Sequence, residues 1–307
     1  MGHHHHNHHH HHHGSTENIR TAFLLNLVFT LIEVVGGILT NSISVLSDAL
    51  HDFGDTLSLG LSWYFDRLSK KKGDDRFTYG YGRFSLLAAL INAIVLITGS
   101  VIILTEAIPR IWQPPEPNAS GMLVLSVLGV LFNGAAMLKL QKGKSMNERM
   151  VYLHMLEDVL GWVALLIISI VMYFYHLPIL DPIFSVVFTA YILWNVLKNL
   201  RKVISIFLQS RPEGISVNSI QQQLAQVNHV CDVHDVHVWS MDGEQTIATM
   251  HIVVPQTLTH QEVAQVKLLS KEALGQMGIQ HSTIEIECDD EQCPMCNLEH
   301  NHQHQHE

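Results

Sequence analysis

The chain has 307 residues, of which 47% are hydrophobic and only 15% charged. Soluble domains usually carry about 25% charged residues, so this composition excludes an ordinary soluble enzyme and any disordered or collagen-like chain. Acidic residues outnumber basic residues by 28 to 18, which argues against nucleic acid as a partner because nucleic acid requires a clustered basic surface. The mean hydropathy of +0.17 is too low for a chain that lies in a membrane throughout, so a water-facing portion is also expected.

Histidine-rich stretches lie near both ends of the sequence. His3–His13 contains ten histidines and His300–His306 contains four. Asn7 interrupts the first run, which favours a natural tail, whereas Gly14-Ser15 is typical of the junction after an expression tag. Residues 1–17 are therefore interpreted as a histidine-rich cytosolic tail, with a tag as the alternative for part of it. Histidine-rich tracts bind metal ions.

Six apolar segments follow this tail, and each has about the 20 residues that cross a hydrocarbon core. Basic residues are concentrated in alternate connections, which by the positive-inside rule places both termini in the cytosol. We therefore expect a multi-pass membrane protein with a transmembrane domain at residues 18–208. The expected helices are residues 18–38, 42–66, 84–108, 119–141, 150–175 and 182–207.

The second and fifth apolar segments each contain an H-x-x-x-D pair, His51 with Asp55 and His154 with Asp158. Residues four apart lie on one face of a helix, so each helix can present an imidazole and a carboxylate to the same point. Two nitrogens and two oxygens form the tetrahedral site that Zn²⁺ prefers. The alternative is hydrogen bonding inside a helix bundle, but ionisable groups in a bilayer are costly and normally face a cavity or a partner.

The same ligand chemistry predicts coupling to protons. Metal binding requires neutral imidazole and ionised carboxylate, so it displaces protons from the site. An intramembrane site that exchanges Zn²⁺ for protons could draw on a proton gradient to export metal. Glu33, Asn26 and Asn133 are candidate groups around such a site, with interhelical hydrogen bonding as the alternative for the two asparagines.

Residues 209–290 have a different character and predict a small cytosolic domain. Its expected elements have the order α-β-β-α-β, which suggests a small sheet with two helices on one face. We expect helices at 215–227 and 259–277 and strands at 232–240, 246–254 and 284–288. Thr259 is a candidate N-cap, and Asp242-Gly243 is the expected turn between the first two strands. Residues 291–307 form a tail with a CxxC pair and further histidines.

Several motifs accompany these spacings. Ser47-Asp48-Ala49 precedes His51, Phe77-Thr78-Tyr79-Gly80-Tyr81-Gly82-Arg83 follows the second segment, and Val236-His237-Val238-Trp239-Ser240 lies in the cytosolic part. Together with the two H-x-x-x-D pairs, they resemble the cation diffusion facilitator family of zinc transporters over roughly residues 18–296. The resemblance implies a homodimeric metal/proton antiporter with a ferredoxin-like cytosolic domain, which is not an enzyme. Its intramembrane site would be His51, Asp55, His154 and Asp158, with Zn²⁺ as the main cargo and Cd²⁺ or Co²⁺ as further candidates.

The resemblance also implies zinc bound by the cytosolic domain. Carried over by position, its ligands are His234, His251, His281 and Cys288, with Glu287 as the alternative to Cys288, and the pair Cys293 and Cys296. Some relatives have a further site in the connection after the second segment. Asp74 fits that site, but Phe77 and Tyr81 occupy the two histidine positions, so we expect the site to be absent or impaired. Arg83 could take part in a charge pair, but its expected partner position is near Gln209.

Two other functions remain as alternatives, a zinc-dependent membrane hydrolase and a membrane metal sensor. A catalytic zinc keeps one position open for water, whereas four intramembrane ligands would close the site, and H-E-x-x-H is absent from the sequence. Six membrane segments would be excessive for a sensor. The short connections favour a bacterial inner membrane as the location.

Overall fold

The computed structural model describes residues 13–69, 71, 73–140 and 146–290. The chain divides into two compact units. The first comprises Met1–Arg67 and Ala88–Leu200, and the second comprises Leu68–Leu87 and Arg201–Glu307. The α3 and α6 helices extend from one unit into the other.

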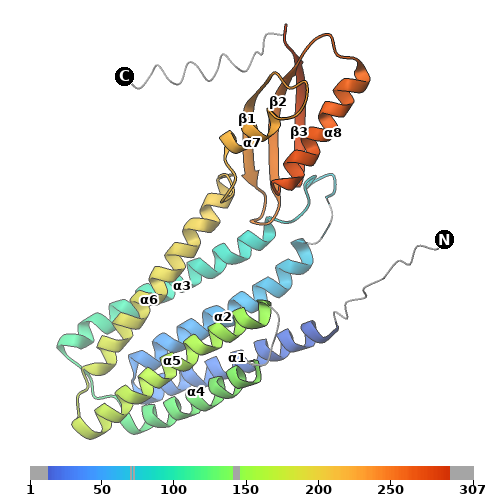
Figure 1. Ribbon diagram of the computed structural model, residues 1–307. Coiled ribbons are helices and arrows are strands. Elements are labelled where there is room, and N and C mark those ends of the chain that lie inside the picture. The colour runs from blue at the N-terminus through green and yellow to red at the C-terminus, as the bar shows by residue number, and fades with distance from the viewer. Residues whose placement is uncertain (1–12, 70, 72, 141–145, 291–307) are drawn as a thin grey trace, which may run out of the picture. The chain divides into compact units, whose positions relative to one another are not determined.

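Each expected apolar segment is helical, and Figure 1 shows the helices in order. Among the described residues, three helical stretches are long and apolar enough to cross a membrane, Phe84–Trp112, Leu156–Tyr175 and Leu180–Phe207. Shorter apolar stretches are Asn26–Thr40 and Ala119–Ala135. The helices are α1 (His13–Thr40), α2 (Ile43–Ser69), α3 (Phe84–Trp112), α4 (Ala119–Leu140), α5 (Met146–Tyr175) and α6 (Leu180–Phe207).

A buried carboxylate from α6 caps the beginning of α2. The first N–H groups of a helix have no partner within it and must be satisfied from outside. Asp181 accepts hydrogen bonds from the backbone N–H groups of Ile43 at 2.9 Å and Ser44 at 3.2 Å, and from the hydroxyl of Ser42 at 2.6 Å. The negative charge also faces the positive end of the helix dipole. This contact ties α2, which carries the first H-x-x-x-D pair, to α6.

The core of the first unit includes a close contact between α4 and α5. Trp162 of α5 is 1% exposed and packs with Phe29, Met122 and Leu165. Its ring lies directly against Gly129 of α4, where a Cβ would meet ring atoms at 2.1 Å. Small residues allow helix backbones to approach closely in membranes, where lipid provides no hydrophobic drive for association.

The second unit contains a three-stranded sheet with two helices (Figure 1). The strand order is β1-β2-β3. Strands β1 and β2 are antiparallel, whereas β2 and β3, which α8 connects in the chain, are parallel. The expected elements are confirmed, except that the third strand begins at His281 and the first helix is shorter. The elements are α7 (Val217–Leu224), β1 (Asp232–Ser240), β2 (Thr246–Val254), α8 (His260–Gln276) and β3 (His281–Cys288).

The two faces of this sheet differ because side chains alternate along a strand. Ala248, Met250, Ile252 and Val254 of β2 are buried in a core with side chains from α7 and α8. The intervening residues of β2, including His251, therefore point to the face away from the helices. Thr259 forms the expected N-cap of α8, in a capping box with Glu262. The backbone N–H of Thr259 donates a hydrogen bond to the Glu262 carboxylate, and this contact is the main reason that the pKa of Glu262 is lowered.

Candidate metal centres

The first cluster joins α2 and α5 inside the first unit. Nε2 of His51 lies 3.7 Å from Oδ2 of Asp55 and 3.8 Å from Oδ1 of Asp158. One ligand atom from each of these residues lies within 4.8 Å of the others. His51 and Asp55 are half-buried and one helical turn apart, whereas Asp158 is buried. His154 lies one turn before Asp158 on α5, but its side chain is outside the described residues.

These separations suit a small divalent cation. Ligand atoms at about 2.0–2.1 Å from a tetrahedral ion are about 3.4 Å apart. The two measured separations, 3.7 and 3.8 Å, are slightly larger, so modest side-chain movement would bring the three groups onto one ion. The cluster has one imidazole and two carboxylates, which is a hard-to-borderline donor set compatible with Zn²⁺.

Further acidic side chains surround this cluster. Asp48 and Asp52 of α2 and Glu33 of α1 are all buried. Asn26 donates hydrogen bonds to the carbonyl of Asp52 at 3.2 Å and to the hydroxyl of Thr56 at 3.0 Å, so it holds α1 against α2. This is the interhelical role that was the alternative for Asn26. A buried group of carboxylates in apolar surroundings favours the entry of a cation.

The second cluster lies on the sheet of the second unit, on the face away from the helices. His234 of β1 and His251 of β2 are opposite each other in the antiparallel register. Oε2 of Glu287 lies 3.1 Å from Nε2 of His234, and Oε1 lies 2.8 Å from Nδ1 of His251. The three ligand atoms lie within 4.8 Å of one another, so this cluster also could hold one metal ion.

A β-bulge shapes the strand beside this cluster. His234 pairs with His251, but His237 pairs with Thr249, so β1 has one residue more than β2 between the two pairs. Asp235 has a positive φ of 49°, which is rare outside glycine. The extra residue leaves His234 and His237 on the same face, although residues three apart normally face opposite sides.

Carboxylates outside the cluster orient its imidazoles. Oδ2 of Asp232 lies 3.0 Å from Nδ1 of His234, which leaves Nε2 of that ring directed at Glu287. Asp235 lies 3.0 Å from His237 and 3.5 Å from Nε2 of His251. Carboxylates of this kind fix the orientation and the tautomer of metal-binding histidines. The signal for this arrangement in the sequence is the spacing D-x-H-D-x-H.

Two of the ligands expected from the sequence lie apart from this cluster, one on the other face of β3 and one at its other end. Cys288 follows Glu287 directly, so its side chain points to the opposite face of β3. His281 lies at the other end of β3, where its ring packs against Tyr79 with centroids 5.6 Å apart. The structure therefore places Glu287, the alternative to Cys288, with His234 and His251. The expected ligands Cys293 and Cys296 lie outside the described residues.

The carboxylate of Asp74 is used within its own loop. It accepts hydrogen bonds from the backbone N–H groups of Phe77 at 2.9 Å and Arg76 at 3.0 Å, and from the hydroxyl of Tyr81 at 2.7 Å. Nζ of Lys71 lies 3.3 Å away and supplies the local positive charge. The Phe77 N–H and then the Tyr81 hydroxyl hold the pKa of Asp74 well below its usual range.

Arg83 also has a contact inside the second unit. Its Nε donates a hydrogen bond to the carbonyl of Met241 at 3.3 Å. The neighbouring Gly82 lies so close to Asp242 that a Cβ would meet its carboxylate at 2.7 Å. The connection before α3 is therefore held to the turn between β1 and β2.

Comparison with known proteins gives matches along most of the chain. Residues 19–208 match the family described as cation efflux transmembrane domain, and residues 212–288 match the cytoplasmic domain of cation efflux proteins. A relative from Bacillus velezensis named "Cadmium, cobalt and zinc/H(+)-K(+) antiporter" is 33% identical over 87% of this chain and 86% of its own. Zinc transporter ZitB of Pectobacterium atrosepticum is 32% identical over 91% of this chain and 89% of its own. Metal cation efflux system protein CzcD of Cupriavidus metallidurans is 30% identical over 89% and 87%.

Proposed function

The chain belongs to the cation efflux family, and we propose that it exports Zn²⁺ from the cytosol in exchange for protons. The observation that carries this proposal is the convergence of His51, Asp55 and Asp158 from two helices of the transmembrane domain. The relatives named as zinc transporters and as a cadmium, cobalt and zinc antiporter support the same conclusion.

In this proposal the intramembrane ligands are His51, Asp55, His154 and Asp158. Binding of Zn²⁺ requires neutral imidazoles and ionised carboxylates, so protons leave the site as the metal arrives. A change in access then exposes the loaded site to the other side of the membrane. Protonation of the ligands on that side releases the metal. The proton gradient thereby supplies the free energy for export.

The cytosolic domain is proposed as a regulatory zinc site and a dimer contact. His234, His251 and Glu287 would hold the resident ion there, with Asp232 and Asp235 orienting the histidines. Zn²⁺ bound at this position would order a homodimer and favour transport. Cys293 and Cys296 remain proposed additional ligands.

The membrane-transporter family and the apolar helices together make this a multi-pass membrane protein. We further propose that all of α1 to α6 cross the membrane, within residues 18–208. The ferredoxin-like domain would occupy residues 209–290 and both termini would lie in the cytosol of a bacterium. Less apolar helices such as α2 cross because their polar side chains are buried against neighbouring helices.

The test is zinc uptake into proteoliposomes with an imposed pH gradient. Asp158→Asn keeps the side-chain size but removes a ligand charge, so we expect uptake to be lost. The exposed Asp75→Asn serves as the matched control and should transport like the wild type. Uptake that survives Asp158→Asn would overturn the site. Zinc binding without flux in the wild type would favour a sensor, and zinc-stimulated hydrolysis would favour an enzyme.

A further inference from the structure

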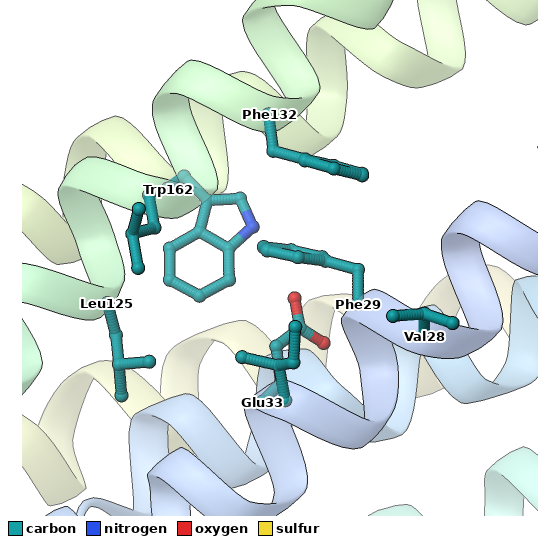
Figure 2. A pocket seen from close by; sticks show the side chains of 8 residues that line it. Val28, Phe29, Glu33, Leu125, Phe132 and Trp162 are labelled. Carbon is teal, nitrogen blue, oxygen red and sulfur yellow. The ribbon is translucent and has the colours of Figure 1, made fainter.

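A pocket between α1, α4 and α5 is lined in part by Glu33, an acid that is not among the four proposed ligands. The pocket has a volume of about 140 Å³. Its surface is entirely apolar, so Glu33 and Trp162 line it with carbon atoms while their polar atoms are buried. The lining residues are Val28, Phe29, Ile32, Glu33, Leu125, Leu128, Phe132 and Trp162. Figure 2 shows the carboxyl group of Glu33 directed toward the rings of Phe29 and Trp162.

Glu33 is enclosed without a group that could balance a negative charge. It is 1% exposed, and among the described residues its carboxyl oxygens meet no N–H or hydroxyl donor; the carboxyl group beside them is that of Asp52. The titratable groups that face it are all acidic, Asp52 and Asp48 on α2 and Asp158 on α5. The pocket side chains from α4 are apolar. An ionised carboxylate is very costly in such surroundings, whereas a protonated one is far less so.

Glu33 nevertheless lies within electrostatic reach of the metal centre. Two of the acidic residues that act on Glu33 belong to that centre or adjoin it. Asp52 directly follows the proposed ligand His51 on α2, and Asp158 is itself a proposed ligand. A divalent cation at the centre would be the largest charge in this region and would stabilise the ionised form of Glu33. Metal binding and proton release at Glu33 are thus linked without Glu33 being a ligand.

We propose that Glu33 carries an exchangeable proton that leaves when the metal binds, so that this side chain is a coupling group of the transporter. In the step, the O–H bond of the carboxyl group breaks, the proton passes to water, and the electron pair stays on the carboxylate. The reverse occurs after the metal has left. This inference rests on the proposed zinc/proton exchange and assigns part of the proton movement to one residue.

The first test uses dicyclohexylcarbodiimide, an apolar reagent for protonated carboxyl groups, on the full-length protein in proteoliposomes. The acid proton moves to a carbodiimide nitrogen and the carboxyl oxygen bonds to the central carbon. The O-acylisourea then rearranges to a stable N-acylurea that peptide mass spectrometry can locate. We expect labelling at Glu33 that Zn²⁺ slows by about tenfold, the scale of coupling between linked binding events. Absence of labelling, or labelling that Zn²⁺ does not change, would overturn the proposal.

The second test measures proton release with a pH indicator when zinc is added to weakly buffered protein. In Glu33→Gln we expect zinc binding to persist while about one proton fewer is released per chain. Glu106→Gln is the matched control, because Glu106 is exposed on α3 beside Arg110. Unchanged release in Glu33→Gln would contradict the inference. If that variant does not fold, the labelling of the wild type still decides. Absence of zinc flux in the wild type would instead refute the proposed function.

Discussion

A single carboxylate, that of Glu287, contacts both histidines of the cluster on the sheet. Its two oxygens lie 3.1 and 2.8 Å from nitrogens of His234 and His251. Glu287 is buried, and both imidazoles have further carboxylates behind them. A buried carboxylate with two imidazoles in contact is a strong candidate for a metal ligand, because each donor is already in place.

Glu287→Gln is expected to weaken zinc binding by the second unit by at least about tenfold, because an amide oxygen is a poorer ligand than a carboxylate. The measurement is calorimetric zinc titration of the full-length protein in an Asp158→Asn background, which removes one of the proposed intramembrane ligands. Cys288→Ser and His281→Ala are the matched controls and should bind zinc like their parent. A larger loss in Cys288→Ser than in Glu287→Gln would show that Cys288 is the ligand.

Asp74 leads to a prediction about pH. Because the folded loop lowers the pKa of Asp74, its ionised carboxylate stabilises the loop at pH values above the usual carboxyl range. This contribution is lost as the pH falls toward the lowered pKa. Tyr81→Phe removes one donor to the carboxylate, so the pKa should rise toward its ordinary value and order in the loop should be lost at a higher pH. A ¹³C NMR titration of the Asp74 carboxyl group checks this, and an unchanged pKa would contradict it.

At the scale of helices, the contact between Gly129 and Trp162 decides how closely α4 and α5 pack. Trp162 lies one turn after Asp158, so the same contact also positions the second ligand-bearing helix. A methyl group at Gly129 would overlap the indole ring, which is buried.

Gly129→Ala should therefore lower the free energy of unfolding by about 1–3 kcal/mol, the usual cost of overpacking. Gly134→Ala on the same helix is the matched control, since a Cβ there has no atom within 4 Å. That substitution should be neutral or slightly stabilising, because alanine favours helix over glycine. Thermal unfolding of the two variants in detergent micelles compares them. Equal stability would show that α4 and α5 are less closely packed than described.

At the scale of the whole molecule, three helices reach the length and composition of a membrane span among the described residues. The proposal that all of α1 to α6 cross depends on burial of polar groups between helices, as at Asp181 and Asn26. The transmembrane family match, which extends from residue 19 to 208, agrees with one continuous membrane domain.

Reporter fusions test this crossing pattern in a bacterial host. Alkaline phosphatase, which is active only outside the cytosol, should be active when fused after Asn41 or Gln113 and inactive after Ser210. The reason is that basic residues are concentrated in the other connections, which stay in the cytosol. An inactive fusion after Asn41 would show that α1 does not cross. Activity after Ser210 would place the second unit outside the cytosol.

Much of the secondary structure of this protein could be predicted from the periodicity of its sequence. The family expected from the motifs is confirmed by the matches along the chain. The helical segments and the β-β-α-β order were also predictable, because apolar runs, alternation and capping residues are local signals. The start of β3 at His281 was missed because the pattern of that strand is weaker in its first half.

The sequence by itself determined that a histidine and an aspartate lie on one face of each of two helices, because helical spacing is a local property. It could not decide between Cys288 and Glu287, because that choice depends on which face of β3 meets His251. Only the tertiary structure brings Glu287 against His234 and His251, through the pairing of three strands and the bulge at Asp235. It also decided that Glu33 is buried at the wall of an apolar pocket, since burial depends on helices far apart in the chain.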